Sequence, residues 1–136
     1  MILSVVTPDK SMVKNLTVES VVLPGELGQM TILPGHVSLI TALSHGSFAY
    51  KEKDKSEWRL AFLNGGFAQV TNNEVMVLAE TMEFASEVDI AQAELEVQSL
   101  NQKLKLVKLD SAEYPELNNK KIIAESRLAA TKKQAN

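Results

Sequence analysis

All six glycines of this 136-residue chain lie between Gly25 and Gly66, and this uneven distribution limits the folds that the chain can adopt. Residues 86–136 contain no glycine and a single proline, Pro115. Glycine and proline are the residues that most strongly mark turns, so turns are concentrated in the first part of the chain. We therefore predict two units: a domain of short strands and tight turns over residues 1–85, and a helical domain over residues 86–136.

The composition excludes several classes of function. Fourteen basic and 17 acidic residues give a net charge of −3, whereas proteins that bind nucleic acid through phosphate contacts are usually basic. The two histidines, His36 and His45, and the absence of cysteine leave no cluster of metal ligands and no disulfide framework. No apolar run approaches the roughly 18 residues of a membrane span, so we expect no direct membrane insertion. No catalytic residue, cofactor or metal is predicted.

Residues 1–85 show the alternation and turn spacing of an all-β sandwich. Trp58, Leu60 and Phe62 alternate with polar or small residues, which is typical of a strand with one buried face. Residues 71–74 contain two adjacent asparagines, which tolerate a positive φ and predict a hairpin turn. Residues 51–57 are a charged hairpin tip. Gly65-Gly66 is interpreted as a bulge or a close backbone approach.

Residues 86–136 predict an antiparallel α-helical hairpin. Ser86, followed by Asp89, resembles the start of a helix. Apolar residues then recur at steps of three and four, which places one stripe along the first helix. The second helix is predicted to begin with Pro115 in its first position and to have a weaker apolar face. The stripe consists of Ile90, Ala93, Val97, Leu100, Leu104 and Val107.

A motif with two Pro-Gly pairs, Pro24-Gly25-Glu26 and Leu33-Pro34-Gly35-His36, flanks a short apolar strand. It is followed in order by Gly65-Gly66-Phe67, by Val77-Leu78-Ala79-Glu80 and by the helix pair. Together these features resemble the epsilon subunit of F-type ATP synthases, over nearly the whole chain.

The resemblance implies a non-catalytic subunit at the foot of the central stalk. In that family the β-sandwich packs on the gamma subunit and touches the polar loops of the c-ring, which couples ion-driven rotation to the catalytic head. Thr31 departs from the family, which often has glycine there. The c-ring contact implied for this chain consists of Gln29, Thr31, Pro34, Gly35 and His36.

The resemblance also implies that the helical hairpin regulates the enzyme. In the family the helices either fold down on the sandwich or extend into the catalytic head, where they obstruct ATP hydrolysis and meet an acidic segment of the beta subunit. Five cations against Glu116 and Glu125 give the second helix a charge of +3, which suits that contact; a solvated face is the alternative. These cations are Lys120, Lys121, Arg127, Lys132 and Lys133.

Some members of the family bind ATP through a motif Ile/Leu-Asp-x-x-Arg-Ala at the start of the first helix. Here the segment reads Val88-Asp89-Ile90-Ala91-Gln92-Ala93, so Asp89 matches but Gln92 replaces the arginine. A neutral amide binds phosphate less strongly than a guanidinium does. We therefore predict weak or absent ATP binding, with Asp89 acting as an acidic group in the first turn of the helix.

Two interpretations remain beside this one. A free-standing, ligand-binding β-sandwich with a helical dimerisation tail also accounts for the apolar stripe, and an enzyme ranks last. The epsilon interpretation predicts a monomer when isolated. It also predicts a peripheral location on the cytoplasmic face of the bacterial inner membrane, with the plastid thylakoid as the other possibility.

Overall fold

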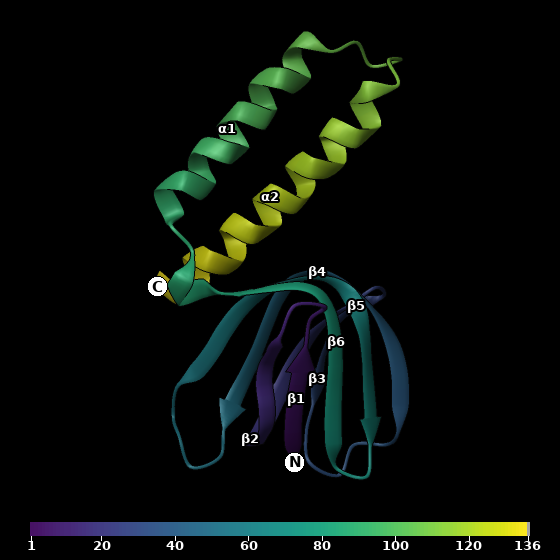
Figure 1. The fold of residues 1–136 in the computed structure, drawn as a ribbon, viewed down its shortest axis with the longest axis vertical. Helices are drawn as coiled ribbons and strands as arrows, with labels where there is room; N and C mark the ends of the chain where they lie inside the picture. Colours follow the sequence, from purple (N-terminus) through teal and green to yellow (C-terminus); the bar gives the residue numbers. More distant parts are fainter. Residues whose placement is uncertain (136) are drawn as a thin grey trace.

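The computed structural model describes residues 1–135, which form six β-strands followed by two long α-helices (Figure 1). Asn72 and Asn73 form the turn between the last two strands with φ values of 49° and 64°, which confirms the predicted hairpin. The strands are β1 (Ile2–Val6), β2 (Ser11–Gly25), β3 (Gly28–Ile32), β4 (Leu39–Glu52), β5 (Trp58–Thr71) and β6 (Glu74–Phe84). They are followed by a 3₁₀ turn (Ala85–Glu87) and by the helices α1 (Ile90–Leu106) and α2 (Glu113–Ala135).

The six strands form one sheet that closes on itself. The strand order is β1-β6-β5-β4-β2-β3, and β1 also pairs with β2, so five strands make a ring to which β3 adds as an edge. The pairing of β1 with β6 is parallel, whereas β2, β4 and β5 pair with their neighbours in antiparallel fashion. This flattened barrel encloses the core, and the helical hairpin follows it, as the sequence predicted for the fold class.

In β4, β5 and β6, the side of the strand that faces the core changes where one row of residues crosses the three strands. The ladder skips the row formed by Ser44, Gly65 and Glu80, and Gly65 and Gly66 there adopt φ values of 75° and 124°. On β5 the core residues are Ala61 and Leu63 before this row, but Ala68 and Val70 after it. Figure 1 shows β4 and β5 arching over the top of the domain beneath the helices.

Because of this change, the side of the strand beginning at Trp58 that faces the core is not the one that carries Trp58, Leu60 and Phe62. Ala61 and Leu63 point into the barrel core, so Trp58, Leu60 and Phe62 occupy the outer face. Phe62 is nevertheless only 4% exposed, because the helical hairpin covers that face. The Gly65-Gly66 pair is a close backbone approach: a Cβ on Gly66 would lie within 2.9 Å of Ala79 Cα.

Both helices begin at residues other than those predicted. Asp89, and not Ser86, is the N-cap of α1, since its carboxylate accepts a hydrogen bond from Gln92 N at 3.2 Å. α2 begins at Glu113, two residues before Pro115, which still lies in the first turn where a missing N–H costs little. Inclusion of Glu113 lowers the net charge of the second helix from +3 to +2.

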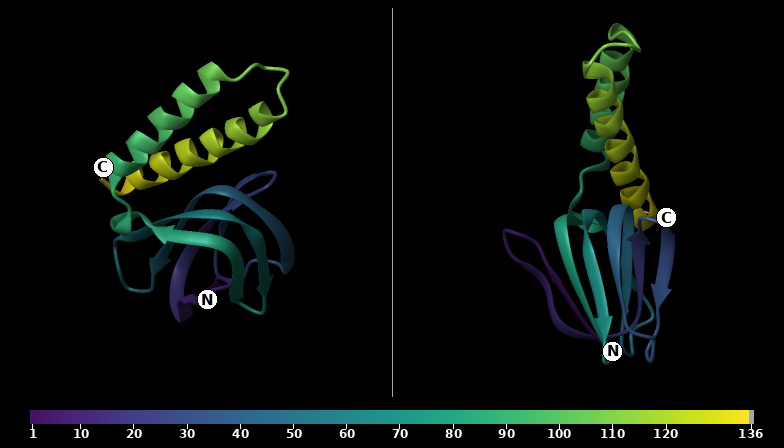
Figure 2. Two further views of the ribbon diagram at one scale, coloured as in Figure 1. Left: turned by 45° about the horizontal axis from the view of Figure 1, so that its top comes forward. Right: turned by 90° about the vertical axis from the view of Figure 1, so that its right-hand side faces the viewer.

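α1 and α2 pack against each other, and none of the six stripe residues of α1 is exposed. Because α2 covers this stripe within the same chain, the seam that a dimerisation tail would need is already occupied. α2 makes the principal contacts with the barrel, on β4, β5 and the turn Ala85–Glu87. Figure 2 shows that the far end of the hairpin projects away from the barrel. Within residues 1–135, neither helix is long and apolar enough to cross a membrane.

Candidate functional site

The Pro-Gly-His loop, defined as Leu33-Pro34-Gly35-His36, lies at the end of the barrel opposite the helices (Figure 1). A turn closes it, with His36 N donating to Leu33 O at 3.1 Å and Gly35 at a φ of 83°. His36 Nδ1 lies 2.8 Å from Val37 O, and Gly35 N donates to Asn73 Oδ1 at 3.0 Å. The loop is therefore a fixed, exposed turn.

The structure divides the five residues of the predicted c-ring contact between two places. Pro34, Gly35 and His36 share the loop, whereas Gln29 lies at the other end of β3, where it lines a hollow with Ser44, His45 and Lys133. Four positions of extended chain separate Gln29 from Leu33 at the start of the loop, which corresponds to roughly 13 Å. Thr31 is exposed on β3 between them. The five predicted residues therefore follow one another from β3 into the loop, and they are not confined to the loop itself.

An exposed apolar surface, which we call the open face, covers the outside of β4, β5, β6 and β1 beyond the skipped row. Cross-strand pairs place Ala42, Phe67, Leu78 and Val6 in one row, and Ile40, Gln69 and Met76 in the next. Phe67 is 59% exposed and Ile40 is 74% exposed. A contiguous apolar surface of this kind marks an interaction site.

A shallow hollow of about 360 Å³ deepens the open face beside Phe67 and Leu78, with Val6 and Pro8 on its rim. Sequence reasoning missed this surface. The available signal was the run Val75-Met76-Val77-Leu78, which is apolar on both faces of one strand although only one face reaches the core.

Arg127 of α2 joins three elements of the structure, and we call this arrangement the clasp. Its Nε and Nη2 donate to the carboxylate of Glu83 on β6 at 2.6 and 3.3 Å, and its Nη1 lies 3.4 Å from Glu96 Oε2 on α1. The hydrogen bonds that the guanidinium donates to Glu83 are the main reason why the pKa of Arg127 is raised. Glu83 pairs with Phe62 across the strands, so the clasp lies beside the covered phenylalanine.

Three more of the predicted inhibitory cations also have acidic neighbours within the chain. Lys120 pairs with Glu116 and Lys121 with Glu125 along α2, at 3.6 and 3.7 Å. Lys132 reaches Glu94 of α1 at 3.4 Å. Lys133 is exposed beside the β2–β3 turn. In this arrangement the cations of α2 are largely directed at the chain's own carboxylates.

The groove between α1 and α2 is lined by Gln92, Leu95, Glu96 and Arg127. Gln92 stands where the family motif has its arginine. The only guanidinium among those lining residues is that of Arg127, and it already binds the carboxylates of Glu83 and Glu96. Asp89 was predicted to lie in the first turn of α1. In the structure it precedes that turn and is the N-cap of the helix.

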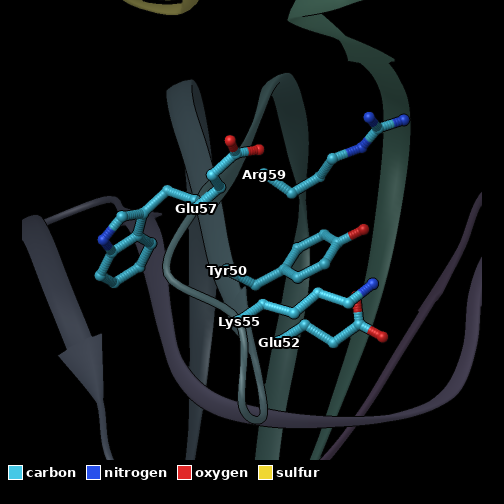
Figure 3. A pocket seen from close by; sticks show the side chains of 6 residues that line it. Tyr50, Glu52, Lys55, Glu57 and Arg59 are labelled. Carbon is cyan, nitrogen blue, oxygen red and sulfur yellow. The ribbon is translucent and has the colours of Figure 1, made fainter.

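A second charged hollow lies at the tip between β4 and β5 (Figure 3). Figure 3 shows the side chains of Tyr50, Lys55 and Glu52 lying side by side with Arg59 above them. Lys55 pairs with Glu52 at 3.0 Å, and the Arg59 guanidinium lies 4.4 Å from the centroid of the Phe84 ring. Burial raises the pKa of Tyr50. Charges of both signs compensate each other here. Among the residues that the structure describes, no group of three His, Cys, Asp or Glu side chains is placed to hold a metal.

Comparison with known proteins agrees with this architecture. The family described as "ATP synthase, Delta/Epsilon chain, beta-sandwich domain" matches residues 1–85. The ATP synthase epsilon chain of Prochlorococcus marinus (strain MIT 9312) is 36% identical and covers 96% of both chains. The ATP synthase epsilon chain of Lawsonia intracellularis is 42% identical over 68% of this chain and 67% of its own.

Solved structures show the same fold at lower identity. A chain of the Euglena gracilis mitochondrial ATP synthase matches 97% of this chain and 77% of its own, with a TM-score of 0.76 and 18% identity. A chain from the central stalk and c-ring of the Tetrahymena thermophila mitochondrial ATP synthase matches 100% of this chain and 96% of its own, with a TM-score of 0.65 and 14% identity. The chain therefore belongs to the epsilon chain family of F-type ATP synthases, as a non-catalytic subunit of that complex.

Proposed function

We propose that this chain is the central-stalk subunit that transmits c-ring rotation to the gamma subunit and the catalytic head. Its family membership and its likeness to a chain of the Tetrahymena central stalk support this role. The observation that carries the proposal is the open face, because an exposed apolar surface across four strands suits a permanent protein partner. The chain works at the membrane as a peripheral piece, on the cytoplasmic face of the bacterial inner membrane, with the plastid thylakoid as the alternative.

The open face is the proposed gamma surface. Val6, Ile40, Phe67, Met76 and Leu78 are all exposed in the isolated chain, and burial of such side chains in an interface supplies most of its free energy. Glu80 beside the hollow and Gln69 between Ile40 and Met76 can satisfy polar groups of the partner. The isolated chain is a monomer in this account, because the stripe of α1 is covered by α2.

The Pro-Gly-His loop is the proposed centre of the c-ring contact, and the exposed Thr31 and Gln29 extend that contact along β3. The loop is exposed, rigid and remote from the helices, so it can press on a polar loop of a ring without disturbing the hairpin. Since the chain has no cysteine, single-cysteine variants give clean cross-links. We expect His36→Cys to cross-link to the c-ring and Phe67→Cys to gamma, and a loop cysteine that reaches gamma instead would remove the ring assignment.

The hairpin is the proposed regulatory element. In the structure it is closed, with its apolar stripe buried internally and the clasp joining it to β6. An extended hairpin that reaches the beta subunit must break the bonds between Arg127 and Glu83 and uncover Phe62. It then frees Arg127, and Lys132 where α1 also leaves α2, to meet acidic groups on the beta subunit beside the exposed Lys133, whereas Lys120 and Lys121 exchange their partners within α2 for those groups. A partner shifts this equilibrium only to the extent that it binds one state better.

The experiment that tests this function is the ATPase activity of the reconstituted catalytic head with and without the chain. We expect the full chain to bind through gamma and to lower hydrolysis, and a chain that ends after Ser86 to bind equally without inhibition. Binding of both forms with unchanged hydrolysis would retain the stalk role and remove the inhibitory one. Failure of either form to bind would contradict the proposal as a whole.

A further inference from the structure

We propose that Asn73 is a positioning residue that holds the Pro-Gly-His loop in the orientation in which it meets its partner in the stalk. The inference rests on the proposed role of that loop. It assigns a function to the β5–β6 turn, which lies 38 residues further along the chain than Gly35.

Asn73 connects three separate segments at one end of the barrel. Its side-chain Oδ1 accepts a hydrogen bond from Gly35 N at 3.0 Å, and its backbone O accepts one from Ile2 N at 3.0 Å. The first bond reaches the loop and the second reaches the start of β1. The turn thus joins the loop to the strands that carry the open face.

The backbone of Asn73 explains why its side chain can make this bond. Its φ of 64° belongs to the left-handed region, which asparagine tolerates better than most residues do. In that conformation the short amide leaves the strand direction and points across to the loop. Asn72 has a similar φ of 49°, but no hydrogen bond of its side chain is found among the described residues.

The loop needs such an anchor because its own bonds are local. The turn bond from His36 N to Leu33 O fixes the shape of the loop, and the contact between His36 Nδ1 and Val37 O fixes the ring of His36. Neither bond ties the loop to the barrel. The bond from Gly35 N to Asn73 does, and it adds to the covalent connections with β3 and β4 a direct link from the loop to β5 and β6, next to the proposed gamma surface.

The pair of asparagines allows a matched test in the full-length chain. Asn73→Gly keeps the positive φ and the backbone bond to Ile2 N, and removes only the amide that holds Gly35. Asn72→Gly makes the same change one residue earlier without touching the loop. Asn73→Asp restores an oxygen acceptor in a residue that also tolerates positive φ.

We expect amide hydrogen exchange of Gly35, measured by NMR, to rise about fivefold in Asn73→Gly, in line with the loss of one exposed hydrogen bond. It should stay unchanged in Asn72→Gly and return toward the wild-type rate in Asn73→Asp. An unchanged Gly35 exchange rate in Asn73→Gly would overturn the proposal.

The second measurement is the cross-linking yield of His36→Cys in the assembled complex, with each asparagine variant added to it. We expect the yield to fall several-fold with Asn73→Gly, and neither with Asn72→Gly nor with Asn73→Asp. An equal yield in all variants would show that the bond does not position the loop. A His36→Cys chain that cross-links to no stalk or ring subunit would instead overturn the proposed function of the loop, and the positioning role with it.

Discussion

Phe62 and Phe67 lie on the same strand, both on its outer face, and their surroundings differ. Phe62 is 4% exposed, whereas Phe67 is 59% exposed. The skipped row at Gly65 separates them: the chain's own helices cover the outer face before it and leave the outer face after it open. One strand therefore presents two apolar surfaces, of which the first is covered by the helical hairpin and the second is open to solvent.

This difference assigns separate physical roles to the two surfaces. The covered face stabilises the closed hairpin. Opening of the hairpin would lose this packing, and the loss is compensated only if the helices bind another partner. The open face is largely exposed, so it contributes less to the stability of the isolated chain. It should therefore govern assembly and not folding, and variants of the two phenylalanines can separate these effects.

The largest expected effect follows from Phe67→Glu. It places a charge in the middle of the open face, so the affinity for gamma should fall by about 100-fold or more, as expected for a central aromatic residue of an interface. The thermal unfolding midpoint of the isolated chain should hardly change, because Phe67 is already exposed. Isothermal titration with a gamma-containing head, beside a melting curve, measures both. Gamma binding at wild-type affinity would remove the open face as the docking surface.

Phe62→Ala should have the opposite pattern. We expect a loss of about 2 kcal/mol in the free energy of unfolding, below the roughly 3–5 kcal/mol of a fully enclosed phenylalanine, because the hairpin can shift to fill the space. Gamma affinity should stay within about twofold of wild type. Denaturant unfolding gives the first quantity. A large loss of gamma affinity from this variant would erase the distinction between the two faces.

The clasp should contribute less than the packing beneath it. Arg127→Gln removes the paired bonds to Glu83 and the contact with Glu96, and we expect the closed hairpin to lose about 1 kcal/mol, since these groups are partly exposed. Lys120→Gln is the control, because Lys120 pairs only within α2 and should change stability by about 0.5 kcal/mol or less. Protease cleavage in residues 85–89, which join the barrel to α1, reports opening of the hairpin. Equal cleavage of both variants would show that the clasp does not hold it.

The sequence supplied the local features and missed those that depend on distant contacts. The Asn72-Asn73 turn follows from residues adjacent in the chain, and it was predicted correctly. The alternation of Trp58, Leu60 and Phe62 did not reveal which face of the strand reaches the core, because the core-facing sides of β4, β5 and β6 change at the skipped row of Ser44, Gly65 and Glu80. The clasp between Glu83 and Arg127 spans 44 positions and has no local pattern, so periodicity could not reveal it.

The smallest expected effect concerns ATP. Gln92 offers no cation, and Arg127 is engaged by Glu83 and Glu96, so we expect titration with ATP to show no binding of micromolar or tighter affinity. Gln92→Arg should bring weak binding that the Arg127→Gln, Gln92→Arg double variant loses. Micromolar binding by the unmodified chain would mean that the clasp opens readily for a phosphate.

The most direct test of the account is hydrogen exchange of the full chain, alone and bound to a gamma-containing catalytic head. We predict that binding slows amide exchange around Phe67, Met76 and Leu78, on the outer half of β5 and β6 that carries the open face. The segment around Phe62 is already covered in the isolated chain, so its exchange should slow little or become faster if the hairpin opens. Protection confined to the Phe62 segment, with the Phe67 segment unchanged, would contradict the account.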